Sequence, residues 1–272
     1  MESLSIYLLS LSLALVTYLT LKDHMIKLLK SKNLLVENYK GKAIVNGAGI
    51  VLLVPCIVAT AIMVLFENNT SYILFIFVVV ILSLTGLIDD LLGVSSTKGL
   101  MGHLKGLTKG EFSTGILKAI AGLVIGAVVA YFNYSSIFGF FMDILIFSLS
   151  VNFINLLDLR PGRAAKAYFL FTVCLLFISG FSEAWVILPV YIGLFFYLNG
   201  EMEEEYMLGD TGASLLGGTC GYYSVLTLSM GNKAVLGFLL VVLHITTEYW
   251  SLSVVIEKIP TLRRLDRLGR KD

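Results

Sequence analysis

The sequence is short of charged residues and of proline. Only 14% of its 272 residues are Asp, Glu, Lys or Arg, and 57% are hydrophobic, whereas soluble domains average about 25% charged and about 45–50% apolar residues. This composition excludes an ordinary soluble globular domain and is typical of an integral membrane protein. The four prolines also argue against long disordered linkers. We therefore expect one integral-membrane domain over residues 1–272.

The sequence also has few cysteines and a net charge close to zero. The three cysteines are scattered through apolar segments, which gives neither a metal-ligand spacing nor a disulfide framework, so we interpret them as small buried residues. The net charge of +1 gives no indication of a nucleic-acid partner. The first apolar segment, residues 4–21, lacks the basic start and the cleavage site of a secretory signal. We interpret it as a membrane span.

Long apolar segments occupy most of the chain. A helix that crosses a bilayer needs about 20 predominantly apolar residues. Nine candidate segments cover residues 4–21, 44–66, 72–88, 115–132, 137–157, 165–181, 184–199, 212–230 and 234–257. We therefore predict an all-α polytopic membrane protein with about nine transmembrane helices.

The positions of Lys and Arg predict the orientation of these helices. With the N-terminus outside the cell, every Lys and Arg except Lys233 lies on the cytoplasmic side or within one turn of it. This is the positive-inside pattern of cell-membrane proteins. It also places the C-terminus in the cytoplasm.

Four aspartates then fall at the cytoplasmic ends of three segments. Asp89 and Asp90 end the third segment, Asp158 ends the fifth, and Asp210 begins the eighth. The first three lie at helix C-termini, where the helix dipole disfavours a carboxylate unless a cation compensates, whereas Asp210 occupies a normal N-cap position. Each aspartate alone is also explained as a solvated loop residue or a cap. Their convergence on one face predicts a site for Mg²⁺, with Mn²⁺ as the alternative ion.

Basic residues lie on the same face. Lys105 and Lys118 are candidates for phosphate binding, and contact with anionic lipid headgroups explains them equally well. Arg160 and Arg163 are stronger candidates, because a guanidinium binds phosphate bidentately, although they are also compatible with the positive-inside pattern alone. Carboxylates and cations at a bilayer surface suggest phosphoryl transfer between a water-soluble and a lipid-soluble reactant.

Three sequence blocks resemble a known enzyme family. They are GLIDD at 86–90, NFINLLD at 152–158 and LGDTGASLLGG at 208–218, and IVNGAGI at 44–50 is similar to the family's glycine-rich entry to its second span. The family is the polyprenyl-phosphate N-acetylhexosamine-1-phosphate transferases, which include phospho-N-acetylmuramoyl-pentapeptide transferase and undecaprenyl-phosphate GlcNAc-1-phosphate transferase. The resemblance implies a Mg²⁺-dependent phosphoglycosyltransferase. It would transfer a sugar-1-phosphate from a UDP-sugar to undecaprenyl phosphate and release UMP for cell-envelope glycan synthesis.

The resemblance also implies roles for single residues. By position, Asp89, Asp90 and Asp158 correspond to the catalytic-region aspartates, and Asp210 corresponds to the aspartate that binds Mg²⁺. The residues that the resemblance places near the substrates are Asn152, Asn155 and Asn199. It further suggests an intramembrane homodimer.

The sequence departs from the family in two places. After Asp158 the family carries a second aspartate, which Pro161 replaces here, and we hypothesise that Arg160 and Arg163 bind a phosphate or an acidic group of the donor instead. The ninth segment leads into a basic stretch rather than into a His-rich loop and a tenth span. We expect the arginines of this stretch either to replace the missing loop as a phosphate-binding element or to bind lipid headgroups. They are Arg263, Arg264, Arg267 and Arg270.

Other polar residues have structural interpretations. The acidic run 201–205 is interpreted as a solvated turn, and His103 as a solvated loop residue. His244 and Glu248 are four residues apart on one helix face, which favours an intramembrane pair.

Three alternatives stay open at this point. A transporter or flippase would carry its polar site near the membrane midplane between structural repeats, and no repeat is evident. A family member that has lost activity and serves as a scaffold is compatible with the altered segment after Asp158. The third alternative keeps the chemistry but uses a different nucleotide sugar.

Overall fold

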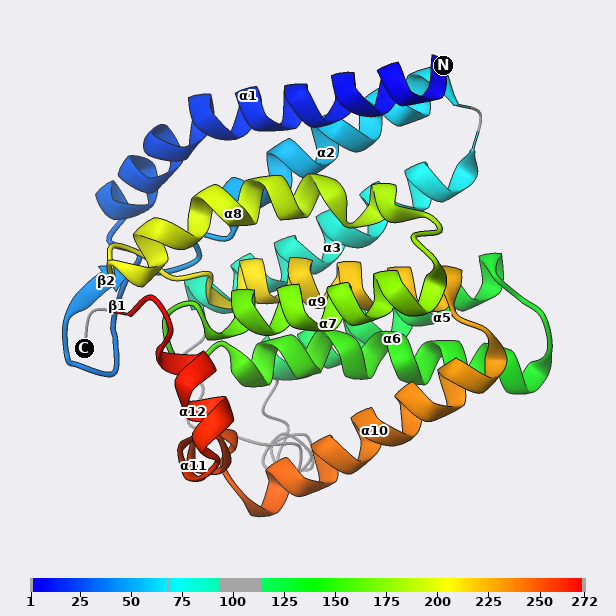
Figure 1. Cartoon of the computed structure of the whole chain (residues 1–272). Helices are drawn as coiled ribbons and strands as arrows, with labels where there is room; N and C mark the ends of the chain where they lie inside the picture. Colours follow the sequence, from blue (N-terminus) through cyan, green and yellow to red (C-terminus); the bar gives the residue numbers. More distant parts are fainter. Residues whose placement is uncertain (1, 68, 93–113, 271–272) are drawn as a thin grey trace.

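The computed structural model describes residues 2–67, 69–92 and 114–270. A helix coincides with each of the nine predicted apolar segments. These helices are α1 (Glu2–Ser31), α2 (Ile50–Phe66), α3 (Thr70–Leu92), α5 (Thr114–Phe132), α6 (Ile137–Leu157), α7 (Arg163–Ser179), α8 (Leu188–Met202), α9 (Gly209–Thr227) and α10 (Met230–Tyr249). Figure 1 shows most of them running along one common direction as a bundle.

The length and composition of these helices confirm a polytopic all-α membrane protein. Six spans in the described ranges are long and apolar enough to cross a bilayer: α1, α3, α5, α6, α10, and α8 together with the short 3₁₀ helix η1 (Ala184–Val186). Helices α2 and α7 have only 17 residues each. Nine crossings and the inside–outside orientation remain predictions.

Helix α9 forms the centre of the bundle. Every residue from Thr211 to Val225 is buried, and the helix packs mainly against α3 and α6. Small residues bring the backbones close together: a Cβ atom added at Gly217 would lie 2.6 Å from Cα of Val151 on α6. A helix enclosed by other helices does not face lipid, so it tolerates the small and polar residues that lower its hydropathy.

Two short strands before α2 were not predicted. Strands β1 (Leu35–Glu37) and β2 (Ala43–Val45) form an antiparallel hairpin with Leu35 opposite Val45. The predicted span 44–66 is therefore wrong at its start, because residues 44 and 45 belong to β2 and the helix begins at Ile50. The hairpin lies at one end of the bundle, beside the C-terminal ends of α1 and α8 (Figure 1).

The predicted ninth span, 234–257, is wrong at its end. Helix α10 stops at Tyr249, and Trp250 has an extended backbone with φ −132° and ψ 129°. Two short helices follow, α11 (Leu252–Lys258) and α12 (Pro260–Arg267). They turn back toward the end of the bundle that carries the hairpin (Figure 1).

The exception to the positive-inside pattern has a partner inside the protein. Nζ of Lys233, in the first turn of α10, lies 2.7 Å from Oδ1 of Asp143 on α6, and both side chains are buried. Since the carboxylate compensates the ammonium within the bundle, Lys233 does not need a cytoplasmic position.

Candidate active site at one end of the bundle

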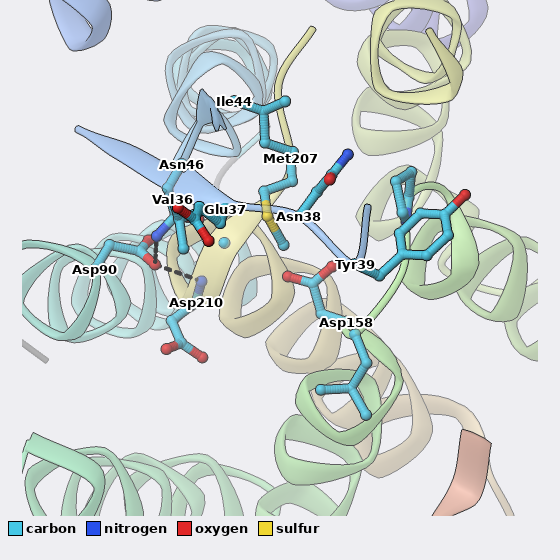
Figure 2. A pocket seen from close by; sticks show the side chains of 13 residues that line it. Val36, Glu37, Asn38, Tyr39, Ile44, Asn46, Asp90, Asp158, Met207 and Asp210 are labelled. Atoms are coloured by element: carbon cyan, nitrogen blue, oxygen red, sulfur yellow. Dashed lines mark hydrogen bonds between the residues drawn. The ribbon is translucent and has the colours of Figure 1, made fainter. Parts of the chain in front are cut away.

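Segments that are far apart in the sequence meet around one cavity. The C-terminal ends of α3 and α6, the start of α9 and the β1–β2 hairpin surround a space of about 230 Å³ (Figure 2). Its lining residues are Val36, Glu37, Asn38, Tyr39, Ile44, Asn46, Asp90, Asp158, Leu159, Pro161, Met207, Gly209 and Asp210. Three of the four predicted aspartates therefore line one cavity.

Asp90 ties α3 to the start of α9 and to the loop before α2. Its Oδ1 accepts hydrogen bonds from the backbone N–H of Asp210 (2.9 Å) and from Nδ2 of Asn46 (3.0 Å). Its Oδ2 accepts from the backbone N–H (2.9 Å) and from Oγ1 (2.6 Å) of Thr211. The unpaired N–H groups and positive dipole end of α9 thus compensate a carboxylate that the C-terminus of α3 disfavours. A cation is not needed to explain Asp90.

Glycines make this contact sterically feasible. Gly209 has φ +65°, in the left-handed region, and a Cβ atom there would lie 2.6 Å from the backbone N of Gly47 and 2.8 Å from Oδ1 of Asp90. A Cβ atom on Gly86 would lie 2.3 Å from the carbonyl oxygen of Asp210. The blocks at 86–90 and 208–218 are therefore two sides of one tightly packed contact.

Lys118 forms ion pairs with both Asp89 and Asp210. Its Nζ lies 2.9 Å from Oδ2 of Asp89 and 2.5 Å from Oδ1 of Asp210. The Lys118 and Asp89 side chains are 18% and 13% exposed, whereas that of Asp210 is 37% exposed. An ammonium between two carboxylates leaves the group of three with one net negative charge. The sequence predicted Lys118 as a phosphate ligand, and the structure places it between Asp89 and Asp210, of which Asp210 lines the cavity.

Asp158 has no such compensation. It follows α6 as its C-cap residue and lines the cavity, and its carboxylate accepts no hydrogen bond from the residues that the structure describes. Desolvation, together with the nearby carboxylates of Glu201 and Asp210, raises the pKa of Asp158 well above its ordinary value. In Figure 2 its carboxylate points toward the side lined by Met207, while the Asp210 carboxylate points away from that side.

The acidic run 201–205 is not a solvated turn throughout. Glu201 is fully buried, and its Oε1 accepts a hydrogen bond from the backbone N–H of Leu208 (3.4 Å). Glu204 is 8% exposed and accepts hydrogen bonds from Nδ2 of Asn38 (3.1 Å) and the hydroxyl of Tyr39 (3.3 Å). Glu204 therefore fastens the β1–β2 hairpin beside the cavity, which the sequence interpretation missed.

Arg163 does not face a donor site, contrary to the hypothesis. Its guanidinium is 4% exposed and donates from Nε (2.7 Å) and Nη2 (3.1 Å) to the two oxygens of Asp266. Its Nη1 also donates to Oγ of Ser253 (2.9 Å). Because these contacts use the bidentate face of the guanidinium, Arg163 attaches the C-terminal segment to the start of α7 instead of presenting itself to a phosphate.

Arg160 stays beside the cavity, while Arg270 does not replace a phosphate-binding loop. Cζ of Arg160 lies 5.5 Å from the ring centroid of Tyr39, which lines the cavity. Arg270 donates from Nη2 to Asp266 (2.7 Å) and from Nε to the carbonyl oxygen of Pro161 (3.1 Å). Arg270 is thus a second structural partner of Asp266.

Three asparagines that were predicted to bind substrate do not line the cavity. Asn152 and Asn155 are half-buried on α6, and Asn199 is exposed on α8. Oδ1 of Asn155 is buried without a hydrogen-bond partner among the described residues. Lys105 lies outside the residues that the structure describes, as does His103. Substrate roles for these residues stay predictions.

Residues that the sequence interpretation missed also contribute to the site. Asn46 lies in the IVNGAGI block, and Thr211 lies in the block at 208–218, so both were within recognised patterns. No sequence pattern indicated Tyr39, because strands of three residues are too short to be recognised from the alternation of apolar and polar residues. Only the folded chain brings Tyr39 to the cavity.

The donor set can be compared with the needs of a magnesium ion. Within residues 2–67, 69–92 and 114–270, no three Asp, Glu, His or Cys side chains lie close enough to hold an ion alone. Mg²⁺ usually takes only one or two protein carboxylates and completes its shell with water and substrate phosphate oxygens. One carboxylate is enough for that requirement, and the candidates are Asp158, which accepts no hydrogen bond from described residues, and the partly exposed Asp210. Their carboxylates point to different sides of the cavity (Figure 2).

Comparison of the chain with models of protein families and with curated proteins gives no match.

Proposed function

We propose that the chain is a phosphoglycosyltransferase of the cell membrane. In this proposal it transfers a sugar-1-phosphate from a nucleotide sugar, by family resemblance a UDP-sugar, to a polyprenyl phosphate at the cytoplasmic face. The observation that carries the proposal is the Asp89–Lys118–Asp210 group near the half-buried Asp158, at the end of a bundle of membrane helices. At that position a water-soluble donor and a membrane-bound acceptor can reach the same side chains.

The contacts suggest different tasks for the adjacent aspartates. Asp90 accepts four hydrogen bonds that hold the start of α9 and the loop before α2, so we assign it a positioning role. Asp89 instead forms an ion pair with the ammonium of Lys118, a group that an incoming phosphate can also bind. We therefore assign Asp89 the task of orienting the acceptor phosphate or taking its proton.

Lys118 can exchange one partner for another during the reaction. Its ammonium is shared by Asp89 and Asp210, and an arriving diphosphate offers additional oxygens of the same charge. In the transfer, an oxygen of the lipid phosphate forms a bond to the β-phosphorus, the bond from that phosphorus to the nucleotide phosphate oxygen breaks, and the nucleoside monophosphate leaves. Lys118 would stabilise the charge that develops on the phosphate oxygens.

Asp158 and Asp210 are the two candidates for the metal ligand. A bound Mg²⁺ ion supplies charge neutralisation of the diphosphate in this class of chemistry. The raised pKa of Asp158 is consistent with a carboxylate whose charge lacks a partner until a cation and substrate are present.

The experiment is an assay of the purified full-length chain. Undecaprenyl phosphate, Mg²⁺ and a panel of nucleotide sugars are incubated with the protein, and both the nucleoside monophosphate and the lipid-linked sugar phosphate are measured. Formation of both products in equal amounts, dependent on both substrates, supports the proposal. The matched variants are Lys118→Met, which should lose activity, and Lys27→Gln, which removes one exposed charge near the end of α1.

Two outcomes would contradict the proposal. The first is absence of both products with every nucleotide sugar, from protein that elutes as a folded species, which would favour a scaffold. The second is an equal residual rate in Lys118→Met and Lys27→Gln, which would place the chemistry elsewhere.

A further inference from the structure

The C-terminal arm, residues 250–270, contains α11 and α12 and is attached to the protein by its inner side. Asp266 is 5% exposed and pairs with Arg163 on α7. Arg270, which also pairs with Asp266 within the arm, donates from Nε to the carbonyl oxygen of Pro161 (3.1 Å). Nζ of Lys166, in the first turn of α7, donates to the carbonyl oxygen of Leu268 (3.1 Å). These contacts place α12 beside the turn that follows Asp158, at the cavity end of the bundle (Figure 1).

The other sides of α12 are apolar and basic. Leu262 and Leu265 are three residues apart in α12 and therefore lie near one another on its surface, and Leu268 follows as the C-cap residue. The three leucines are 38%, 52% and 66% exposed. Arg263 and Arg264 are exposed as well, and no acidic side chain in the described part of the chain pairs with either. The protein therefore covers neither the leucines nor this pair of charges.

The arm begins at the end of a membrane helix. It follows α10, which is long and apolar enough to cross a bilayer. Two aromatic residues stand at the junction, Tyr249 and Trp250, and they are 78% and 62% exposed. Exposed Tyr and Trp at the end of a membrane helix are typical of the level of the lipid headgroups. The arm thus begins at headgroup depth.

We propose that the C-terminal arm docks on an anionic bilayer surface. Leu262, Leu265 and Leu268 enter the boundary between headgroups and acyl chains, and Arg263 and Arg264 contact lipid phosphates. An amphipathic helix of this kind binds through buried apolar area together with attraction to anionic lipids. Docking of the arm does not depend on the transferase activity.

The arginines allow a quantitative expectation. Each basic residue near an anionic bilayer surface changes the ratio of docked to undocked arm by about fivefold. Replacing both Arg263 and Arg264 should therefore lower that ratio by about 25-fold. Removing the anionic lipid from the bilayer should have a similar effect, because the leucines alone provide only part of the binding.

The test uses the full-length chain in lipid nanodiscs with a spin label on the arm. Leu265→Cys carries a nitroxide, in a Cys174→Ser background. Cys56 and Cys220 are buried as expected, but Cys174 is exposed, contrary to the sequence interpretation. The measurement is the accessibility of the label to oxygen, which enters the bilayer, and to a water-soluble nickel complex. Nanodiscs of phosphatidylcholine are compared with nanodiscs that also contain phosphatidylglycerol.

The expected result is a label that is oxygen-accessible when phosphatidylglycerol is present and nickel-accessible in phosphatidylcholine alone. The variant Arg263→Gln/Arg264→Gln should show the nickel-accessible state in both lipids. The matched control is Lys27→Gln/Lys30→Gln, which removes two exposed charges near the end of α1 and should behave like the unmodified chain.

Three results would overturn the proposal. One is a nickel-accessible label in both lipids. Another is an oxygen-accessible label that responds to neither the lipid nor the two arginines, since the leucines would then be covered without anionic lipid. The third is strong spin–spin broadening, which would show that a second copy of the chain covers the leucines.

Discussion

Replacing Asp90 by Asn should destabilise the protein more than it impairs chemistry. The carboxylate accepts four hydrogen bonds, two at each oxygen, from Asn46, Asp210 and Thr211. An asparagine keeps one accepting oxygen but presents an NH₂ group where the other oxygen stood. Two of the four donors then lose their acceptor, and the helix dipole of α9 loses its compensating charge.

The size of the effect follows from these contacts. A hydrogen bond to a charged group contributes about 1.5–3 kcal/mol, so the loss of two should lower the free energy of unfolding by about 3–6 kcal/mol. We expect the apparent melting temperature of purified Asp90→Asn in detergent to fall by on the order of 10 °C. The measurement is thermal unfolding followed by the fraction of protein that still elutes as a folded species.

Asp89→Asn is the matched control, because it removes the neighbouring carboxylate and the same charge. Asp89 pairs with Lys118, which keeps Asp210 as a partner, so this variant should unfold within a few degrees of the unmodified chain and lose transferase activity. An Asp90→Asn protein that melts at the unmodified temperature and is inactive would refute the positioning role. Asp90 would then act in the chemistry.

Single contacts give three further predictions. Lys118→Met should lower the rate of nucleoside monophosphate release by at least about 100-fold, and a rate within threefold of the unmodified one would count against its role. Lys233→Met leaves Asp143 buried without its cation and should cost about 3–5 kcal/mol of stability; adding Asp143→Leu should restore most of the melting temperature. Asp158→Asn should raise the melting temperature at neutral pH while abolishing activity. Because the pKa of Asp158 is raised, its charged form destabilises the fold, so the gain should grow as pH rises above about 4, and a pH-independent gain would contradict this explanation.

The helices could be predicted because membrane helices carry a strong local signal. Each of the nine apolar segments contains a helix, and the errors lie at segment ends. Residues 44 and 45 are apolar like the span after them, but they belong to β2. Residues 250–257 continue the apolar run, but the extended backbone of Trp250 ends α10. Composition reports burial in lipid or protein and does not distinguish a strand or a turn from one more helical turn.

The convergence of the aspartates was predicted, but their partners were not. Alternation of helix direction brings the ends of α3, α6 and α9 that carry the aspartates to one end of the bundle, and this follows from the order of the spans alone. Which cation meets which carboxylate depends on side-chain reach between segments that are distant in the sequence. Arg163 illustrates this, because its partner Asp266 lies in a segment that composition describes only as basic.

The structure changes what the sequence blocks imply about activity. Asp90, Gly86 and Gly209 are explained by the close packing of α3 against the start of α9, and a chain without catalytic activity would need them equally in order to fold. Their presence therefore does not distinguish an enzyme from a scaffold. Lys118 does not distinguish them either, because its ammonium compensates the carboxylates of Asp89 and Asp210 in the fold. Asp158 favours the proposed enzyme, because a desolvated carboxylate without a hydrogen bond from described residues opposes folding. A chain under selection only for its fold would have little reason to keep an uncompensated carboxylate at that position.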